Sequence, residues 1–424
     1  MPRAGRRGVA FYGDDFTGSV DALLQFARRG WTGRLFTGLP DAATLRRAAD
    51  EVDVVGVAGI SRSLSPVEMD AELRPVFAAF AALEPAIVQY KACSTADSAP
   101  QVGSLGRVIE LARESFGERA VPMLFAQPDF GRYTLFGQHF AAERGTVYRL
   151  DRQPTMSHHP STPMTEADLA VHIGRQTDLP IASIPLVAYD DLAALLRGAP
   201  EAALVLDALT DEHLITVGAA VAALSSPVFA IGSGGLSHGI AAAAPGHGVA
   251  VPTSTASEGP VLVVSGSRSA QTRRQADAAA AAGWLVQPLP LDGDGLEAVL
   301  PGVHEALGTG RGVVLTSDDA DAASAGNRAV LEAIAEAAAS VVSVVARAGA
   351  AHRVIVCGGD TSSRVTRLLG VESLSIAANP WGNVVLLRAH AADAADEAVD
   401  GLELLLKGGQ VGADTLFTDV AALG

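Results

Sequence analysis

Two adjacent carboxylates near the start of the chain are residues of the type that proton transfer requires. They lie in the segment Gly13–Gly18, of sequence GDDFTG, directly after the apolar run Gly8–Tyr12. One of them can accept the proton of a hydroxyl group while the other holds a metal ion or a substrate hydroxyl. Helix capping by one Asp, with help from Thr17, is the alternative, but it explains only one of the two. We therefore predict catalytic roles for Asp14 and Asp15 and leave open which of them is the base.

Cations and hydroxyl groups follow two further apolar runs. Arg62 comes after the run Val52–Ile60 and could hold a carboxylate through two parallel hydrogen bonds, although an ordinary surface Arg would look the same. The segment Tyr90–Ser98, YKACSTADS, brings Lys91, three hydroxyl groups and a carboxylate into one turn. Such a turn suits a polyhydroxylated anion, and a polar loop without a function is the alternative.

A fourth polar region begins with the sequence QPDFGR at 127–132. It continues with His139, the pair His158–His159 and the segment Thr162–Met164. Neighbouring histidines alone are weak support for a metal site. We interpret these histidines as substrate-contacting or structural residues and assign no metal ligand.

Glycine-rich segments indicate a different kind of site in the last part of the chain. Val264–Ser269, Cys357–Ser363 and Lys407–Gly412 each follow an apolar run. Small residues before a helix leave backbone N–H groups free to bind phosphate oxygens, and the helix dipole adds to the attraction. Three tight turns without a ligand are the alternative, but three such loops in one domain favour a nucleotide site.

Short apolar runs alternate with helical patterns, which predicts the elements that position these segments. The alternation indicates a mostly parallel sheet with helices on both faces, and such sheets bind ligands at the carboxyl ends of their strands. The runs expected as strands in the first part of the chain are Gly8–Tyr12, Val52–Ile60, Ala86–Tyr90, Met123–Ala126 and Leu204–Leu206.

A linker is predicted at 244–259, which is rich in Pro, Gly, Ser and Thr. A second alternating series follows. Its expected strands are Pro260–Val264, Gly312–Leu315 and Arg353–Cys357, and its expected helices are Ala270–Ala282 and Asp321–Ala348. We therefore predict an α/β protein of two domains, 1–245 and 246–424, each a mostly parallel sheet flanked by helices.

Composition excludes several classes of function. The net charge of −16 and the pI of about 5.0 argue against nucleic acid and anionic membrane as partners. Cys93 and Cys357 are far apart and form no zinc pattern. No GxxxxGK[ST] sequence is present, and Gly232–Ser237 has Ser where a dinucleotide fingerprint has its third Gly.

The basic N-terminus lacks the apolar region of a signal peptide, and Gly and charge interrupt every apolar run, so we expect a cytoplasmic protein.

Taken in order, these motifs resemble those of the four-carbon acid sugar kinases, which include threonate, erythronate and 3-oxo-tetronate kinases. The resemblance covers nearly the whole chain. The segments that carry it are DDFTG at 14–18, YKxCSTxDS at 90–98, Gly131-Arg132, His159-Pro160 with Thr162-Pro163-Met164, SGSxS at 265–269, GGDTS at 358–362 and the final KxG at 407–409.

The resemblance implies an N-terminal domain that binds an acid sugar and a C-terminal domain that binds ATP with Mg²⁺. The residues then expected to bind or activate the sugar acid are Asp14, Asp15, Arg62, Lys91, Ser94, Thr95, Asp97 and Arg132. Those expected to bind ATP are Ser265, Gly266, Ser267, Gly358, Gly359, Asp360, Thr361 and Gly408. A homodimer is a further expectation from the family.

Departures from the family pattern bear on the substrate more than on the chemistry. Ala96 stands where an aromatic residue is usual, Arg268 where Cys is usual, and Asp360 where many members have Glu. Residues 377–382 lack a longer acidic stretch that contains Pro and Gly. The acid sugar and the hydroxyl that is phosphorylated therefore stay undetermined.

The expected reaction is phosphoryl transfer from ATP to a hydroxyl of a small acid sugar. Such transfer depends on positioning and charge neutralisation. Lys91 or Arg62 would pair with the sugar carboxylate, and domain closure would exclude water. An isomerase or dehydrogenase would need a metal cluster or an intact dinucleotide motif. A non-catalytic sensor on the same scaffold stays open, and binding without turnover would reveal it.

Overall fold

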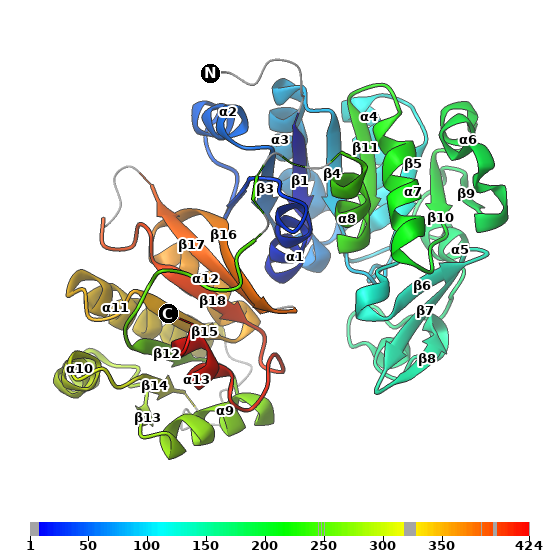
Figure 1. The fold of residues 1–424 in the computed structure, drawn as a ribbon. Coiled ribbons are helices and arrows are strands. Elements are labelled where there is room, and N and C mark those ends of the chain that lie inside the picture. Colours follow the sequence, from blue (N-terminus) through cyan, green and yellow to red (C-terminus); the bar gives the residue numbers. More distant parts are fainter. Residues whose placement is uncertain are drawn as a thin grey trace. The chain divides into compact units, whose positions relative to one another are not determined.

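The computed structural model describes residues 8–244, 246, 248–249, 251–317, 328–382, 384–392 and 397–423. The chain folds into two compact units, Met1–Ala250 and Val251–Gly424 (Figure 1). Each unit has a mostly parallel sheet flanked by helices, so the predicted fold class is confirmed.

The main sheet of the first unit is parallel, and its central strands are buried on both faces, as is typical of parallel sheets covered by helices. The strand order is β2-β3-β1-β4-β11-β5-β10-β9. The strands are β1 (Val9–Gly13), β2 (Gly33–Phe36), β3 (Val54–Ala58), β4 (Ile87–Lys91), β5 (Val121–Leu124), β9 (Ile181–Ile184), β10 (Ala203–Leu206) and β11 (Val228–Gly232).

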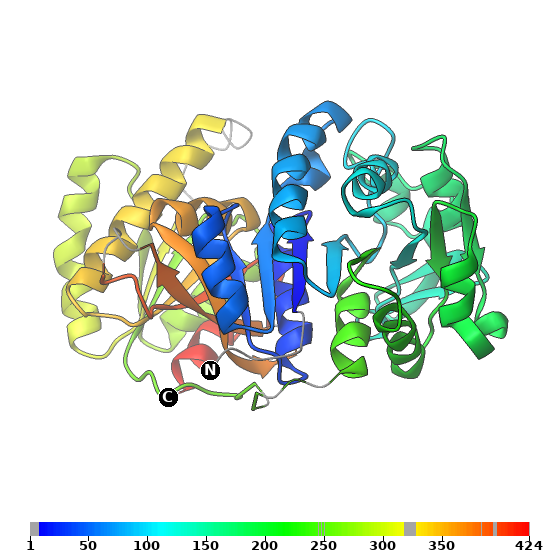
Figure 2. The same cartoon turned by 90° about the horizontal axis from the view of Figure 1, so that it is seen from above.

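Helices cover both faces of this sheet (Figures 1 and 2). Helices α1, α8 and α7 lie side by side over one face, and α3 and α4 pack together on the other. The helices are α1 (Phe16–Ala27), α2 (Ala42–Glu51), α3 (Pro66–Leu83), α4 (Leu105–Phe116), α5 (Leu169–Gly174), α6 (Leu192–Gly198), α7 (Asp211–Ala222) and α8 (Gly234–Ala243). A core that includes Tyr12, Phe77, Phe80 and Phe229 lies between the sheet and the helices.

A small antiparallel sheet is inserted after β5. It consists of β6 (Arg132–Leu135), β7 (Gln138–Glu143) and β8 (Thr146–Arg149), joined by tight turns. The turn after β6 contains Phe136 and Gly137, both with positive φ. The sequence-based interpretation, which assigned strands from short continuous apolar runs, did not predict this sheet.

The second unit has the strand order β13-β14-β12-β15-β18-β17-β16. The first five strands of this order run parallel, whereas β17 runs antiparallel to both β18 and β16. The strands are β12 (Val261–Ser265), β13 (Leu285–Pro288), β14 (Val313–Thr316), β15 (Arg353–Cys357), β16 (Val371–Trp381), β17 (Val384–Ala391) and β18 (Glu403–Lys407). The helices are α9 (Ala270–Ala281), α10 (Gly293–Gly308), α11 (Arg328–Arg347), α12 (Gly359–Leu368) and α13 (Leu416–Ala421).

Helix α11 corresponds to the predicted helix Asp321–Ala348, whose residues 321–327 lie outside the described part of the chain. Within the described residues, its segment Ala329–Arg347 is the one stretch that is long and apolar enough to cross a membrane. Its side chains Ile334, Val341 and Val345 are buried inside the second unit. This burial is typical of a core helix.

Candidate functional site

The carboxyl ends of β1, β3 and β4 bring three of the predicted segments together in the first unit. Strand β1 lies between β3 and β4, and Gly13 is in register with Ala58 on one side and Lys91 on the other. The backbone N–H of Asp14 donates to the carbonyl of Lys91 at 3.0 Å, and the N–H of Arg62 donates to the carbonyl of Asp14 at 3.2 Å. The parallel topology therefore places these side chains at one edge, as predicted.

Asp14 and Asp15 have different environments. Arg62 donates from Nε and Nη2 to both carboxylate oxygens of Asp14, at 3.0 and 2.7 Å, and from Nη1 to Asp15 at 2.7 Å. Asp14 is buried, and burial raises the pKa of its carboxyl group while Arg62 opposes that rise. Asp15 keeps 34% of its side chain exposed and also caps α1 by accepting from the Gly18 N–H at 2.7 Å. The Gly18 N–H thus occupies Oδ1 of Asp15 and Arg62 occupies Oδ2, while about a third of the side chain remains exposed.

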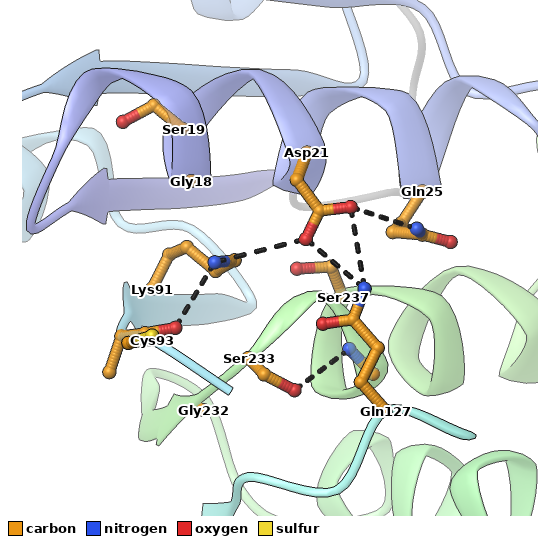
Figure 3. Close-up of polar contacts among 12 residues, drawn as sticks. Gly18, Ser19, Asp21, Gln25, Lys91, Cys93, Gln127, Gly232, Ser233 and Ser237 are labelled. Atoms are coloured by element: carbon orange, nitrogen blue, oxygen red, sulfur yellow. Dashed lines mark hydrogen bonds and ion pairs between the residues drawn. The ribbon is translucent and has the colours of Figure 1, made fainter. Parts of the chain in front are cut away.

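A second carboxylate–cation cluster surrounds Lys91 (Figure 3). Its Nζ donates to the carbonyl of Ala92 at 3.1 Å and lies 3.8 Å from Oδ2 of Asp21. Gln25 and Gln127 both direct their side-chain amides toward the Asp21 carboxylate, at 3.0 and 3.3 Å. The cluster therefore joins helix α1, the end of β4 and the segment after β5.

Asp21 was missed by the sequence-based interpretation, and a signal for it existed. Gly18, Asp21 and Gln25 are three and then four residues apart, so they lie on one face of α1. A small residue and two polar ones on a face that otherwise faces a core indicate that the face borders a polar site.

Gly18 has a steric reason to lack a side chain. A Cβ at this position would lie 2.5 Å from Oδ1 of Asp15 and 3.0 Å from Nζ of Lys91. A side chain at position 18 would therefore crowd both the Asp15 carboxylate and the Lys91 ammonium group.

The loop after β4 carries Ser94, Thr95 and Asp97 and is held by distant segments. The carbonyl of Ser94 accepts from Nε2 of His139 at 2.8 Å, and the hydroxyl of Thr95 contacts the Cys93 thiol at 3.0 Å. Asp97 accepts a hydrogen bond from the Thr162 hydroxyl. The structure thus brings the predicted loop against the 159–162 segment.

His139 is a buried neutral side chain. Burial lowers its pKa to about 4, even though the bond to Ser94 favours the protonated form. Because Nε2 donates to a carbonyl, Nδ1 accepts from the Thr134 hydroxyl, at 2.9 Å. His139 therefore has a structural role between β7 and the loop after β4.

Arg132 begins β6, and its Nη1 donates to the carbonyls of Phe130 and Ala142 at 2.6 and 3.2 Å. Burial lowers the pKa of its guanidinium group, against the opposite effect of Cys93 and Glu143. Its buried Nε has no hydrogen-bond partner, and within the described ranges it forms no ion pair. Arg132 is thus a partly buried cation with donors available to an anion.

Three glycine loops meet in the second unit, as predicted. Strand β15 lies between β12 and β18, with Cys357 in register with Ser265 and Lys407. The Gly266 N–H donates to the Cys357 carbonyl at 3.0 Å, and the Gly358 N–H donates to the Lys407 carbonyl at 2.9 Å. The loops that follow these strands therefore form one continuous surface.

Close backbone approach explains the glycines at this edge. A Cβ on Gly266 would lie 2.2 Å from the Thr361 hydroxyl oxygen, and Gly358 has a φ of +113°. Gly359 is different, because nothing in the described residues lies within 4 Å of its Cβ position. Asp360 is exposed in the first turn of α12. Helix α12 has no side-chain cap, so its first N–H groups are free for a ligand.

Hydroxyl groups link the first loop to the third. The hydroxyls of Ser269 and Thr272 both donate to the Gly409 carbonyl, the latter at 2.9 Å, and Ser267 lies 3.2 Å from the Thr272 hydroxyl. Lys407, the last residue of β18, donates from Nζ to Thr272 at 3.0 Å. The prediction named Gly408 beside it but gave Lys407 no role.

Comparison with known proteins also divides the chain into two parts, which correspond to the two structural units. A family model described as a sugar-binding N-terminal domain matches residues 9–240, and one described as a nucleotide-binding C-terminal domain matches residues 262–417. The chain is 38% identical to the 3-oxo-isoapionate kinase of Paraburkholderia graminis, over 96% of this chain and 93% of that protein. It is 32% identical to the 3-oxo-tetronate kinase of Pseudomonas fluorescens, over 86% of each.

Solved structures share the fold. A Salmonella typhimurium LT2 protein superposes with a TM-score of 0.78 at 22% identity, over 98% of both chains. A Haemophilus influenzae protein gives a TM-score of 0.74 at 20% identity, over 98% of this chain and 99% of that one. At these identities the likeness concerns the fold alone.

The two matched domains define a two-domain kinase. The chain belongs to the four-carbon acid sugar kinase family, as its motifs predicted. It is accordingly an enzyme, an ATP-dependent kinase that acts on an acid sugar.

Proposed function

We propose that this enzyme transfers the γ-phosphoryl group of ATP to a hydroxyl of a small 3-oxo acid sugar. The observation that carries the proposal is the identity of 38% to a 3-oxo-isoapionate kinase over nearly the full length of both chains. The relatives named 3-oxo-tetronate kinase support the same substrate class. We therefore expect a 3-oxo-isoapionate or a 3-oxo-tetronate to be the preferred substrate.

The sugar acid would bind at the carboxyl edge of the first unit. Because Arg62 already holds Asp14 and Asp15, we assign the substrate carboxylate to the cations Lys91 and Arg132. A carboxylate gains most from charged donors that other carboxylates do not fully occupy. The sequence had suggested either Lys91 or Arg62 as the partner of the sugar carboxylate. The present assignment keeps Lys91 and replaces Arg62 with Arg132.

Asp15 is the base in this proposal. The two oxygens of Asp14 are bonded to Arg62 in a buried place, whereas Asp15 is one-third exposed. A general base must reach the hydroxyl proton that it accepts. Asp14 would then fix Arg62, and Arg62 would fix the orientation of Asp15. Ser94, Thr95 and Asp97 would contact the sugar hydroxyls.

ATP would bind to the loops after β12, β15 and β18 of the second unit. Free N–H groups at the start of α12 and the hydroxyls of Ser265, Ser267 and Thr361 suit phosphate oxygens. No group of three or more His, Cys, Asp or Glu side chains that could form a metal cage is present in the part of the chain that the structure describes. Mg²⁺ needs only one or two carboxylates beside phosphate oxygens. The exposed Asp360 fits that need, and the ion would neutralise phosphate charge.

An assay of ADP release tests the proposed function. The purified enzyme would receive ATP, Mg²⁺ and one acid sugar at a time, from a panel of 3-oxo-isoapionate, 3-oxo-tetronates, threonates and erythronates. Release with a 3-oxo acid at the highest kcat/KM is the expected result. Release only with the reduced acids would assign a different substrate class, and ATP binding without turnover on any acid would favour a sensor.

Location and assembly belong to the proposal as well. We infer a cytoplasmic enzyme because its substrates are ATP and a small metabolite acid. A homodimer remains a prediction from the family resemblance, and light scattering of the eluted protein would test it.

A further inference from the structure

Lysine is rare in this chain, and its positions form a pattern. Of 31 basic residues only two are Lys, at positions 91 and 407, and the other 29 are Arg. Lys91 is the last residue of β4 in the first unit, and Lys407 is the last residue of β18 in the second. Both are buried, with exposed fractions of 3% and 2%. The chain therefore has Lys only at the carboxyl ends of β4 and β18, where we place the sugar acid and ATP.

The chemistry of the two cations explains why Arg does not occupy these positions. A guanidinium group is a wide fork with five N–H donors, whereas an ammonium group is a compact point charge with three donors that rotate. At the end of a buried strand, space is limited by the neighbouring strands and by the helix that follows. The compact ammonium group of Lys fits there, and its rotatable donors can bind either a tetrahedral phosphate or a planar carboxylate.

Lys407 has no anionic partner among the described residues. Its Nζ donates to the Thr272 hydroxyl at 3.0 Å and lies 5.9 Å from the centre of the Phe417 ring. Cys357 is its neighbour on β15, but burial raises the pKa of that thiol to about 11, so the thiol is neutral near pH 7. Lys91 differs, because the Asp21 carboxylate lies 3.8 Å from its Nζ.

An unpaired buried charge is unfavourable, which calls for an explanation of Lys407. A cation out of water without a counter-charge destabilises a fold by several kcal/mol in general. A structural tie to Thr272 would need only a neutral hydrogen-bond donor. The location points to a bound anion as the counter-charge, because the Thr272 hydroxyl contacts the Gly409 carbonyl and the Ser267 hydroxyl of two glycine loops. The ammonium group thus lies directly behind the loops that we assign to ATP.

We propose that Lys407 is the cation that compensates the charge of the ATP phosphates, as Lys91 compensates the sugar carboxylate in the other unit. The proposal rests on the proposed function, which places ATP on the loops after β12, β15 and β18. It adds a binding residue at a position to which the resemblance assigned only the neighbouring Gly408. Two of the three Nζ donors remain for phosphate oxygens after the bond to Thr272.

The two lysines provide matched variants. In Lys407→Met, ATP affinity falls about tenfold to a hundredfold, as for loss of one charge-assisted contact, and affinity for the sugar acid is retained. In Lys91→Met the pattern is reversed. Without ligand, Lys407→Met unfolds at the wild-type temperature or above it, because the variant removes an unpaired buried charge. The rise in unfolding temperature that ATP causes in the wild type is lost.

A structural role would give the opposite pattern. Lys407→Met would then unfold at a lower temperature without ligand and would bind ATP with wild-type affinity wherever it remains folded. That result overturns the proposal. If the wild-type enzyme itself does not bind ATP, the proposed function fails first. The two failures are therefore distinguishable.

The wild-type protein allows a second measurement that requires no stable variant. Labelling with ¹³C-lysine gives signals from two side chains only, which a conservative Lys407→Gln sample assigns. We expect saturating ATP to raise the pH at which the Lys407 signal titrates, because a nearby anion favours the charged ammonium, and AMP to raise it less. An identical titration with and without ATP contradicts the proposal.

Discussion

Arg62 binds both oxygens of Asp14 through Nε and Nη2, at 3.0 and 2.7 Å, in a buried place at the end of β1. This contact ties the turn after β3 to the strand beside it. The third Arg62 contact reaches Asp15, which is more exposed than Asp14, and we propose separate roles for the two adjacent carboxylates. Two single substitutions separate these roles.

Asp15→Asn is expected to lower kcat by about a hundredfold or more, since general-base catalysis contributes about that much. ATP affinity and the free energy of unfolding stay near their wild-type values, because the amide oxygen can still accept from the Gly18 N–H that caps α1 and Arg62 keeps its two bonds to Asp14. Steady-state kinetics, an ATP titration and urea unfolding check the three quantities. Unchanged turnover would remove Asp15 from the base role.

Asp14→Asn is the matched control, and its main effect falls on stability. The variant leaves the guanidinium group of Arg62 without its buried counter-charge, and breaking such a pair costs about 3–5 kcal/mol. Urea unfolding measures this loss. A fully stable Asp14→Asn enzyme with abolished turnover would instead make Asp14 the base.

Gly18→Ala is expected to raise the KM for the sugar acid and to leave the KM for ATP unchanged. The new Cβ would lie within 3.0 Å of both the Asp15 carboxylate and the Lys91 ammonium group. Gly302→Ala in α10 is the control, since nothing lies within 4 Å of its Cβ position in the described structure. The control should gain up to about 1 kcal/mol of stability from helix propensity alone. Equal effects of the two variants would contradict the steric argument.

Gly359→Val is expected to raise the KM for ATP about tenfold without loss of stability. No described atom lies within 4 Å of the added Cβ, so the side chain enters the space that we assign to the nucleotide. Gly293→Val, at the first residue of α10 and equally open, is the control and should not change the KM for ATP. An effect of Gly359→Val on the sugar acid alone would mean that the roles of the two units are reversed.

His139 should make the stability of the enzyme depend on pH. Its pKa is about 4 in the folded protein and about 6.5 in an unfolded chain. Its contribution is fully present above pH 6.5. Between pH 6.5 and 4 the unfolded state binds a proton that the folded state does not, so about 1.4 kcal/mol is lost per pH unit. Urea unfolding of wild type and His139→Gln at pH 7 and pH 5 measures the difference. Parallel pH profiles would show that folding does not lower the pKa of His139.

The strands that position both sites were predictable because each is a short, continuous apolar run. The predicted strand Arg353–Cys357 coincides with β15, and the predicted helix Ala270–Ala282 differs from α9 by one residue. The polar loops at the carboxyl ends of these strands followed from the general property of parallel sheets. Short apolar segments with polar neighbours, such as β6–β8, carry no comparable signal.

The pairing of side chains across segments was not predictable. The partners of Asp97 and Ser94 lie 65 and 45 residues further along the chain, at Thr162 and His139, and only the fold brings them together. The sequence suggested a carboxylate ligand for Arg62, and the structure identifies Asp14 and Asp15 as its partners. Asp21 was missed because only polar residues that directly follow apolar runs were considered as site residues.

The central claim is that phosphate passes from ATP to a hydroxyl of the acid sugar. Phosphorus-31 NMR of the reaction mixture with 3-oxo-isoapionate or a 3-oxo-tetronate tests it most directly. We predict a new phosphomonoester signal that grows in equal amount with ADP. Growth of inorganic phosphate with ADP, and no ester signal for any acid sugar of the panel, would contradict the account.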